Sequence, residues 1–224
     1  MFTDVEQSNG GNRSSRSTTS DAPINLKAST PHLHFVEQLG QDCLKIGRFR
    51  GQKGQKNTWL LDCREFLANS LTARRVAREI HGLASQHFDG VSQFAGTGIG
   101  ASFLIGAMLG AIEEPIQATL IRPVRKKYGM RKQLEGRVNP HQPICIVDDI
   151  LNSGDTAIRV ADVLRQKGFQ KIYFVSIFRF DWGVGRERLT EIKIPSTELA
   201  EVYRTQQDEF VPKRRSSFWH SLWR

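Results

Sequence analysis

Two adjacent carboxylates and the small polar loop after them are the residues in this chain best suited to chemistry. Asp148 and Asp149 come directly after a continuous apolar run at residues 144–147. A run of this length predicts a strand that is buried on both faces of a sheet. The polar segment at residues 152–156 reads Asn-Ser-Gly-Asp-Thr, and apolar residues then recur at helical spacing over residues 157–164. The predicted order is therefore strand, acidic pair, loop and helix.

This order places polar groups where α/β sheets bind ligands. Ligands lie outside the carboxyl ends of the strands, and the first turn of a helix presents unpaired N–H groups that suit a phosphate. Ser153 and Thr156 add hydroxyl donors. Asp148 and Asp149 would repel a phosphate, so sugar hydroxyls or a magnesium ion are their natural partners. A ligand with a 5′-phosphate at the loop and ribose hydroxyls at the aspartates satisfies both ends.

The whole pattern resembles the signature of the type I phosphoribosyltransferases, in which a strand, two acidic residues, two apolar residues and a Thr/Ser-Gly-x-Thr loop follow one another. The alternative, that the two aspartates merely end a strand, accounts for a lone acidic pair but not for the whole pattern. In that family the loop holds the 5-phosphate of phosphoribosyl pyrophosphate (PRPP). The resemblance assigns PRPP binding to Asp148, Asp149, Asn152, Ser153, Gly154, Asp155 and Thr156, with Asp148 and Asp149 also holding Mg²⁺ directly or through water.

A second unit of strand, glycine turn and helix precedes the first. Residues 91–95 predict a strand, residues 96–100 (Gly-Thr-Gly-Ile-Gly) a turn, and residues 103–111 an apolar helix. A tight turn without a ligand is the alternative for a lone Gly-x-Gly. In the type I family this turn holds the pyrophosphate through backbone N–H groups, so the resemblance assigns that role to Gly96, Thr97 and Gly98.

A strongly basic segment follows the strand predicted at residues 118–123. Residues 122–136 are too charged to pack, so they predict an exposed loop. A solvated loop or a nucleic-acid patch is one interpretation. The segment also resembles the catalytic loop of the orotate phosphoribosyltransferases. This resemblance assigns pyrophosphate binding to Arg122, Arg125 and Lys126, and catalysis to Arg122, Lys126 and Asp149.

The acceptor base would contact two distant parts of the chain. A helix is expected over residues 34–44 and a hairpin or hood loop over residues 45–56, ahead of a strand at residues 59–61. Farther along, a strand predicted over residues 171–178 ends at Arg179, and the orotate enzymes use an Arg at this point to read the base carboxylate. The resemblance assigns base binding to Arg179, Lys53 and Leu61.

The resemblance covers about residues 44–183, with departures that leave the acceptor open. Leu60 and Leu61 stand where the family carries an aromatic pair that stacks on the base. Pro123 and Tyr128 replace a lysine and a histidine of the catalytic loop.

Composition predicts one α/β domain with tails. Of the 224 residues, 39% are hydrophobic, and no apolar run approaches the length of a membrane span. We expect a disordered tail at residues 1–28, a phosphoribosyltransferase domain at residues 29–210 and a basic, aromatic tail at residues 211–224. The domain would have a mostly parallel central sheet flanked by helices and a small hood at about residues 30–60. Three cysteines without metal spacing favour free thiols in the cytoplasm.

Three functions are compatible with these residues. The first is an enzyme that transfers the 5-phosphoribosyl group of PRPP to a nitrogenous, orotate-like base, uses Mg²⁺ and forms a homodimer by family analogy. The second is a PRPP-binding regulator, whose net charge of +9 suits nucleic acid. The third is an effector without turnover that contacts a protein partner. Arg122 and Lys126 favour the enzyme, because a sensor does not need to stabilise a leaving group.

Overall fold

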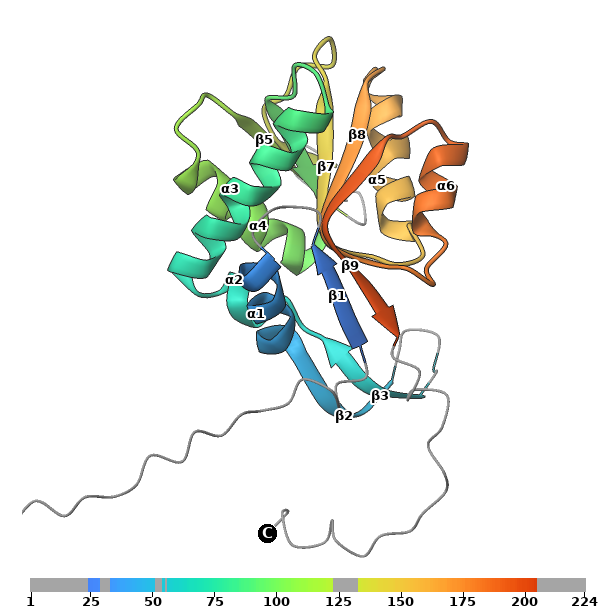
Figure 1. Ribbon diagram of the computed structural model, residues 1–224. Helices are drawn as coiled ribbons and strands as arrows, with labels where there is room; N and C mark the ends of the chain where they lie inside the picture. The colour runs from blue at the N-terminus through green and yellow to red at the C-terminus, as the bar shows by residue number, and fades with distance from the viewer. Residues whose placement is uncertain (1–23, 29–32, 51–53, 55, 123–132, 205–224) are drawn as a thin grey trace, which may run out of the picture.

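The computed structural model describes residues 24–28, 33–50, 54, 56–122 and 133–204 (Figure 1). Lys53, Pro123, Arg125, Lys126 and Tyr128 lie outside the described residues, as do most of the expected N-terminal tail and the expected C-terminal tail. The roles suggested for them stay predictions.

A seven-stranded sheet in the order β1-β9-β8-β7-β4-β5-β6 forms the centre of the molecule. The five inner strands are parallel, and the edge strands β1 and β6 are antiparallel to their neighbours. The mostly parallel sheet expected from the sequence is therefore confirmed. The strands are β1 (Ile24–Ala28), β4 (Gln93–Gly96), β5 (Gln117–Ile121), β6 (Leu134–Gly136), β7 (Ile144–Leu151), β8 (Ile172–Phe180) and β9 (Ser196–Arg204).

Helices cover both faces of this sheet, which explains the continuous apolar run in β7. Successive side chains of a strand point to opposite faces. Cys145 and Val147 join the core beneath helices α3 and α4, whereas Ile144 and Ile146 join the core beneath α5. Figure 1 shows α3 and α4 on one side of the sheet and α5 and α6 on the other. These helices are α3 (Ser70–His87), α4 (Gly98–Ala111), α5 (Asp155–Gln166) and α6 (Gly185–Glu191).

The expected hood is present as a small layer at one end of the sheet (Figure 1). It consists of α1 (Leu33–Cys43), the antiparallel hairpin of β2 (Leu44–Arg50) and β3 (Lys56–Leu61), and the short α2 (Arg64–Leu67). The helix and hairpin predicted for residues 34–56 are thus confirmed.

Two strands differ from the sequence prediction. Residues 24–28, expected in the disordered tail, form β1, which pairs with β9. From residue 184 to residue 203 the sequence predicts a mixture of helix and loop, but residues 196–204 form β9. The carboxylate of Glu198 argues against a buried strand, and it is accommodated because Arg179 and Arg186 pair with it.

Two element boundaries also differ from the sequence prediction. The predicted strand at residues 144–147 continues through both aspartates to Leu151, because Asp148 and Leu151 still pair with residues of β8. The spacing of apolar residues also predicts a helix over residues 72–87 with Thr72 as its cap, but Thr72 does not cap α3. The cap is Asn69, whose side-chain oxygen accepts hydrogen bonds from the backbone N–H groups of Leu71 and Thr72 at 3.1 and 3.2 Å.

Candidate active site

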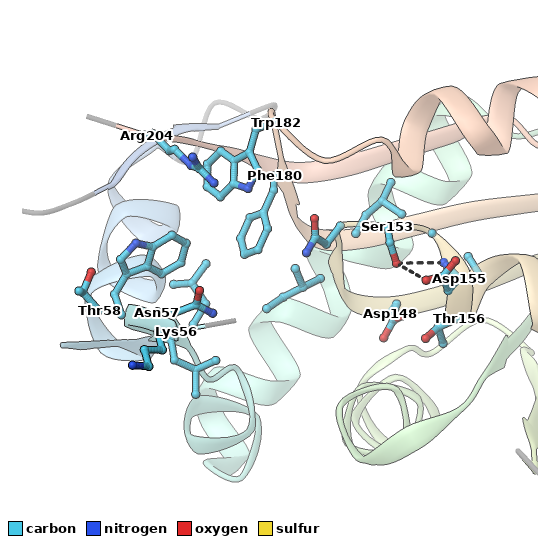
Figure 2. A pocket seen from close by; sticks show the side chains of 18 residues that line it. Lys56, Asn57, Thr58, Asp148, Ser153, Asp155, Thr156, Phe180, Trp182 and Arg204 are labelled. Atoms are coloured by element: carbon cyan, nitrogen blue, oxygen red, sulfur yellow. Dashed lines mark hydrogen bonds between the residues drawn. The ribbon is translucent and has the colours of Figure 1, made fainter. Parts of the chain in front are cut away.

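A cavity of about 700 Å³ lies between the hood and the carboxyl ends of β7 and β8. Its walls come from residues 56–61 of the hairpin, residues 152–156 of the loop, and Phe180 and Trp182 at the end of β8 and just after it. Figure 2 shows Ser153, Asp155 and Thr156 at one end and Phe180, Trp182 and Arg204 at the other. The cavity therefore joins the predicted phosphate loop to the hood.

A second, smaller cavity of about 290 Å³ adjoins the first. Residues 97–100 of the glycine turn, the Asp148–Asp149 pair and Arg159 line it. Asp148 and Thr156 line both cavities, so the two share a boundary. The fold therefore brings the glycine turn, the acidic pair and the phosphate loop together, as the sequence predicted.

The two carboxylates are held in fixed positions at this boundary. An oxygen of Asp148 accepts a hydrogen bond from the backbone N–H of Asp149 at 3.0 Å, and an oxygen of Asp149 accepts one from Ile150 at 3.0 Å. Burial of its carboxylate, together with the charge of Asp149, raises the pKa of Asp148 well above the usual range. A cation or hydroxyl donors beside the pair would lower the free energy needed to ionise Asp148 next to Asp149.

The phosphate loop takes its shape from a glycine and from two side chains. Gly154 precedes α5 with φ at +76°, a left-handed conformation that favours glycine. The hydroxyl of Ser153 donates to the carboxylate of Asp155 at 2.8 Å. Thr156 lies in the first turn of α5, where backbone N–H groups can meet an anion.

Two residues of helix α6 donate hydrogen bonds to the phosphate loop, a contact that the sequence did not reveal. Arg188 donates hydrogen bonds at 2.5 Å to the carbonyl oxygen of Ser153 and to the carboxylate of Asp155. The backbone N–H of Gly185 donates to the carbonyl oxygen of Asn152 at 2.8 Å. The positive charge of Arg188 also offsets the negative charge of Asp155, which would otherwise repel a phosphate.

The glycine turn is shorter than predicted, because Gly96 belongs to β4 and Gly98 begins α4. Gly98 has φ at +81°. The hydroxyl oxygen of Thr97 is buried without a hydrogen-bond partner in the described part of the chain, and Thr97 lines the smaller cavity. A buried polar atom without a partner indicates a position where a ligand can supply one.

Two predicted site residues lie in ion pairs and are absent from the walls of both cavities. Arg122, the residue directly after β5, pairs with Glu135 at 2.7 Å. Arg179 is 7% exposed and pairs with Glu198 and Glu201. Leu61 does line the larger cavity, although it is largely buried.

Several residues that the sequence did not single out as site residues line the cavities, among them residues with aromatic rings or charge. Trp59, Phe180, Trp182 and Arg204 lie on the larger one, and Arg159 lies on the smaller one. The position of Arg159, three residues after Thr156 on the predicted helix, could have signalled its place near the loop. The others meet only through the tertiary fold.

Comparisons with known proteins found similar sequences and similar structures, although no family model matches the chain. Orotate phosphoribosyltransferase of Pyrococcus furiosus is 26% identical over 130 residues, which are 58% of this chain and 70% of that protein. The Bacillus anthracis enzyme of the same name is 26% identical over 153 residues, or 68% of this chain and 72% of that protein.

Solved structures give the same result for the fold. Orotate phosphoribosyltransferase of Mycobacterium tuberculosis in complex with PRPP superposes with a TM-score of 0.61 at 18% identity, covering 74% of this chain and 93% of that one. An adenine phosphoribosyltransferase gives a TM-score of 0.56 at 14% identity, covering 74% and 99%. The chain has the type I phosphoribosyltransferase fold. Among curated proteins, orotate phosphoribosyltransferases are its sequence relatives, so the resemblance is confirmed.

Proposed function

We propose that this chain transfers the 5-phosphoribosyl group of PRPP to a nitrogenous base and releases pyrophosphate. In this reaction the bond between C1 of the ribose and the pyrophosphate oxygen breaks, and a bond between C1 and a base nitrogen forms. The nitrogen's proton leaves to solvent. The observation that carries the proposal is that the two cavities meet at Asp148 and Thr156.

That meeting point divides the substrates between the two cavities. The 5-phosphate would lie on residues 152–156 and the ribose hydroxyls at the acidic pair. The pyrophosphate would lie in the smaller cavity, against residues 97–100 and Arg159, and the base would lie toward the hood. Fixing both reactants in this way makes transfer effectively unimolecular. Positive charge near the departing pyrophosphate stabilises the transition state.

The acidic pair fits a magnesium ion. Mg²⁺ prefers oxygen ligands and is commonly bound through one or two carboxylates together with substrate phosphates. Asp148 and Asp149 both line the smaller cavity, where the pyrophosphate would lie. When bound, the ion would neutralise charge on the leaving group. Among the described residues no cluster of three or more His, Cys, Asp or Glu could hold a metal.

A homodimer is part of this proposal and is supported by the exposed face of α4. Ile99, Phe103 and Leu109 are 62%, 43% and 53% exposed on this helix, and they lie beside Gly106. Exposed apolar side chains that gather on one face indicate a contact surface.

No helix among the described residues is both long and apolar enough to cross a membrane. The buried, free cysteines support a reducing compartment such as the cytoplasm.

Pyrophosphate release tests the proposed reaction. The full chain would be incubated with PRPP and Mg²⁺ and offered orotate, uracil, adenine or guanine in turn. Release that requires both PRPP and one of the bases is expected. Saturable PRPP binding without release for any base would overturn the enzyme and favour a PRPP-binding regulator or effector.

A further inference from the structure

Three aromatic side chains form a corner at the hood end of the larger cavity. The rings of Phe180 and Trp182 are stacked, with centroids 4.7 Å apart and planes 16° apart. Trp59 stands nearly perpendicular to both, with interplanar angles of 79° to Phe180 and 86° to Trp182. All three side chains are half-buried and line the cavity, and Figure 2 shows Phe180 and Trp182 side by side on its wall.

Such a corner suits a planar ring. A ring that lies parallel to one wall is perpendicular to the other, so it can make a stacked contact and an edge-to-face contact at once. Leu60 and Leu61, which stand at the family's aromatic positions, lie on the same hairpin as Trp59. The aromatic surface that the sequence lacks there is supplied by Trp59 and by two residues at the end of β8 and just after it.

The charge at this end of the cavity is positive. Arg204 lies over the ring of Trp182, 4.6 Å from its centroid, and Lys56 lies on the cavity wall. The acidic residues that line the cavity, Asp148 and Asp155, belong to the phosphate-loop end. An anionic substituent on an acceptor at the hood end would therefore meet Lys56 and Arg204.

Arg179 is poorly placed for the same task. Its guanidinium pairs with Glu198 and Glu201, and it is absent from the cavity wall. An arginine that already pairs with two carboxylates has little positive charge left to offer a ligand. Arg204 is exposed and lies on the wall.

We propose that Trp59, Trp182 and Arg204 are the residues that select the acceptor. The two tryptophans hold a planar heterocycle, and Arg204, rather than Arg179, reads an anionic substituent on it. This inference rests on the proposed function, because it treats the hood end of the larger cavity as the acceptor subsite.

Equilibrium binding, which does not depend on turnover, tests the inference. Orotate and uracil differ by one carboxylate, so they serve as matched probes. Each would be titrated against the full chain in the presence of ribose 5-phosphate, which has no pyrophosphate to lose and so permits no turnover, with tryptophan fluorescence and calorimetry as readouts. We expect Arg204→Gln to weaken orotate binding by about tenfold to a hundredfold and to change uracil binding by less than about twofold. Arg204→Lys should restore part of the loss, because it keeps the charge but not the planar fork.

Trp182 is tested by a pair of variants. Trp182→Leu removes the aromatic face but keeps an apolar side chain. It should weaken the binding of both probes by about fivefold or more, whereas Trp182→Phe should weaken their binding less.

Arg74→Ala, which removes an exposed arginine on α3, is the control for the loss of one positive charge in Arg204→Gln. PRPP affinity should stay within about twofold of wild type in all of these variants.

Two results would overturn the inference. One is orotate binding that survives both Arg204→Gln and Trp182→Leu within about twofold of wild type. The other is a wild-type chain that binds PRPP but neither probe. A wild-type chain that does not bind PRPP would instead contradict the proposed function, so the two failures are distinguishable.

Discussion

Gly100 lies directly against the carboxylate of Asp149. A Cβ atom at Gly100 would come within 2.4 Å of an Asp149 carboxylate oxygen, far inside any real contact. The first turn of α4 thus approaches the acidic pair closely only because residue 100 has no side chain. This contact links the glycine turn to the carboxylates and sets the shape of the smaller cavity.

Gly100→Ala should therefore damage the site. The added methyl group must displace the Asp149 carboxylate or shift α4, and overpacking of this kind typically costs ~1–3 kcal/mol. We expect Mg²⁺-dependent PRPP binding to weaken by about tenfold or more. Calorimetric titration of PRPP measures the effect.

Gly82→Ala is the matched control, because Gly82 lies inside the neighbouring helix α3 and a Cβ atom there meets nothing within 4 Å. It should leave PRPP binding unchanged and stabilise the fold by ~0.5–1 kcal/mol. Equal binding by the two variants would show that the contact between Gly100 and Asp149 does not matter.

Asp148 should make stability depend on pH. Because its pKa is raised in the folded chain above the ordinary value of 3.8, the folded state binds a proton more tightly than the unfolded state does. The stability linked to this proton is fully present below the unfolded pKa and is lost as pH rises through the raised, folded pKa. Asp148→Asn removes this loss, so its free energy of unfolding should exceed that of wild type at neutral pH and vary less with pH.

Urea unfolding between about pH 4 and pH 8 measures this difference, with Asp181→Asn, at an exposed carboxylate after β8, as the control. PRPP binding by Asp148→Asn should fall at the same time. A variant less stable than wild type at neutral pH would mean that the carboxylate is stabilised by contacts that outweigh its burial.

Arg188→Ala should weaken the contact between helix α6 and the phosphate loop. It removes the bonds to the Ser153 carbonyl and to the Asp155 carboxylate, and it leaves the negative charge of Asp155 beside the phosphate. We expect PRPP affinity to fall by about tenfold. The pair is partly exposed, so the free energy of unfolding should change by less than ~1 kcal/mol.

Arg165→Ala is a close control for this variant. Arg165 also donates to a backbone carbonyl at 2.5 Å, that of Ile192, and lies near an exposed carboxylate, that of Asp162. It lies in the last turn of α5, away from the loop. The same loss of PRPP affinity in both variants would point to general loosening of α5 and α6 rather than to the loop.

The sequence predicted the central motif because its signals are local. The apolar run before Asp148 and the helical spacing after Thr156 depend on neighbouring residues, and both correspond to observed elements. Strand β9 was missed because its buried Glu198 is tolerated only through arginines of β8 and α6. No spacing along the chain reveals such partners.

The residues of the candidate site likewise fall into two groups, those that local sequence predicts and those that only the tertiary fold brings together. The residues of the phosphate loop and of the glycine turn could be predicted from the sequence, because each group directly follows an apolar strand. The contacts of Arg188 with the loop and of Arg204 with Trp182 join residues 22 to 35 positions apart, and the packing of α6 and β9 creates them. The role suggested for Arg179 came from its place at a strand end, and only the tertiary structure reveals its two carboxylate partners.

Titration of PRPP with Mg²⁺ into wild type and into Asp148→Asn/Asp149→Asn tests the central claim most directly. We predict saturable binding by wild type and a loss of about a hundredfold or more in the double variant. Circular dichroism and thermal unfolding would establish that the variant is folded. Unchanged PRPP affinity in a folded double variant would contradict the assignment of the acidic pair to the PRPP site.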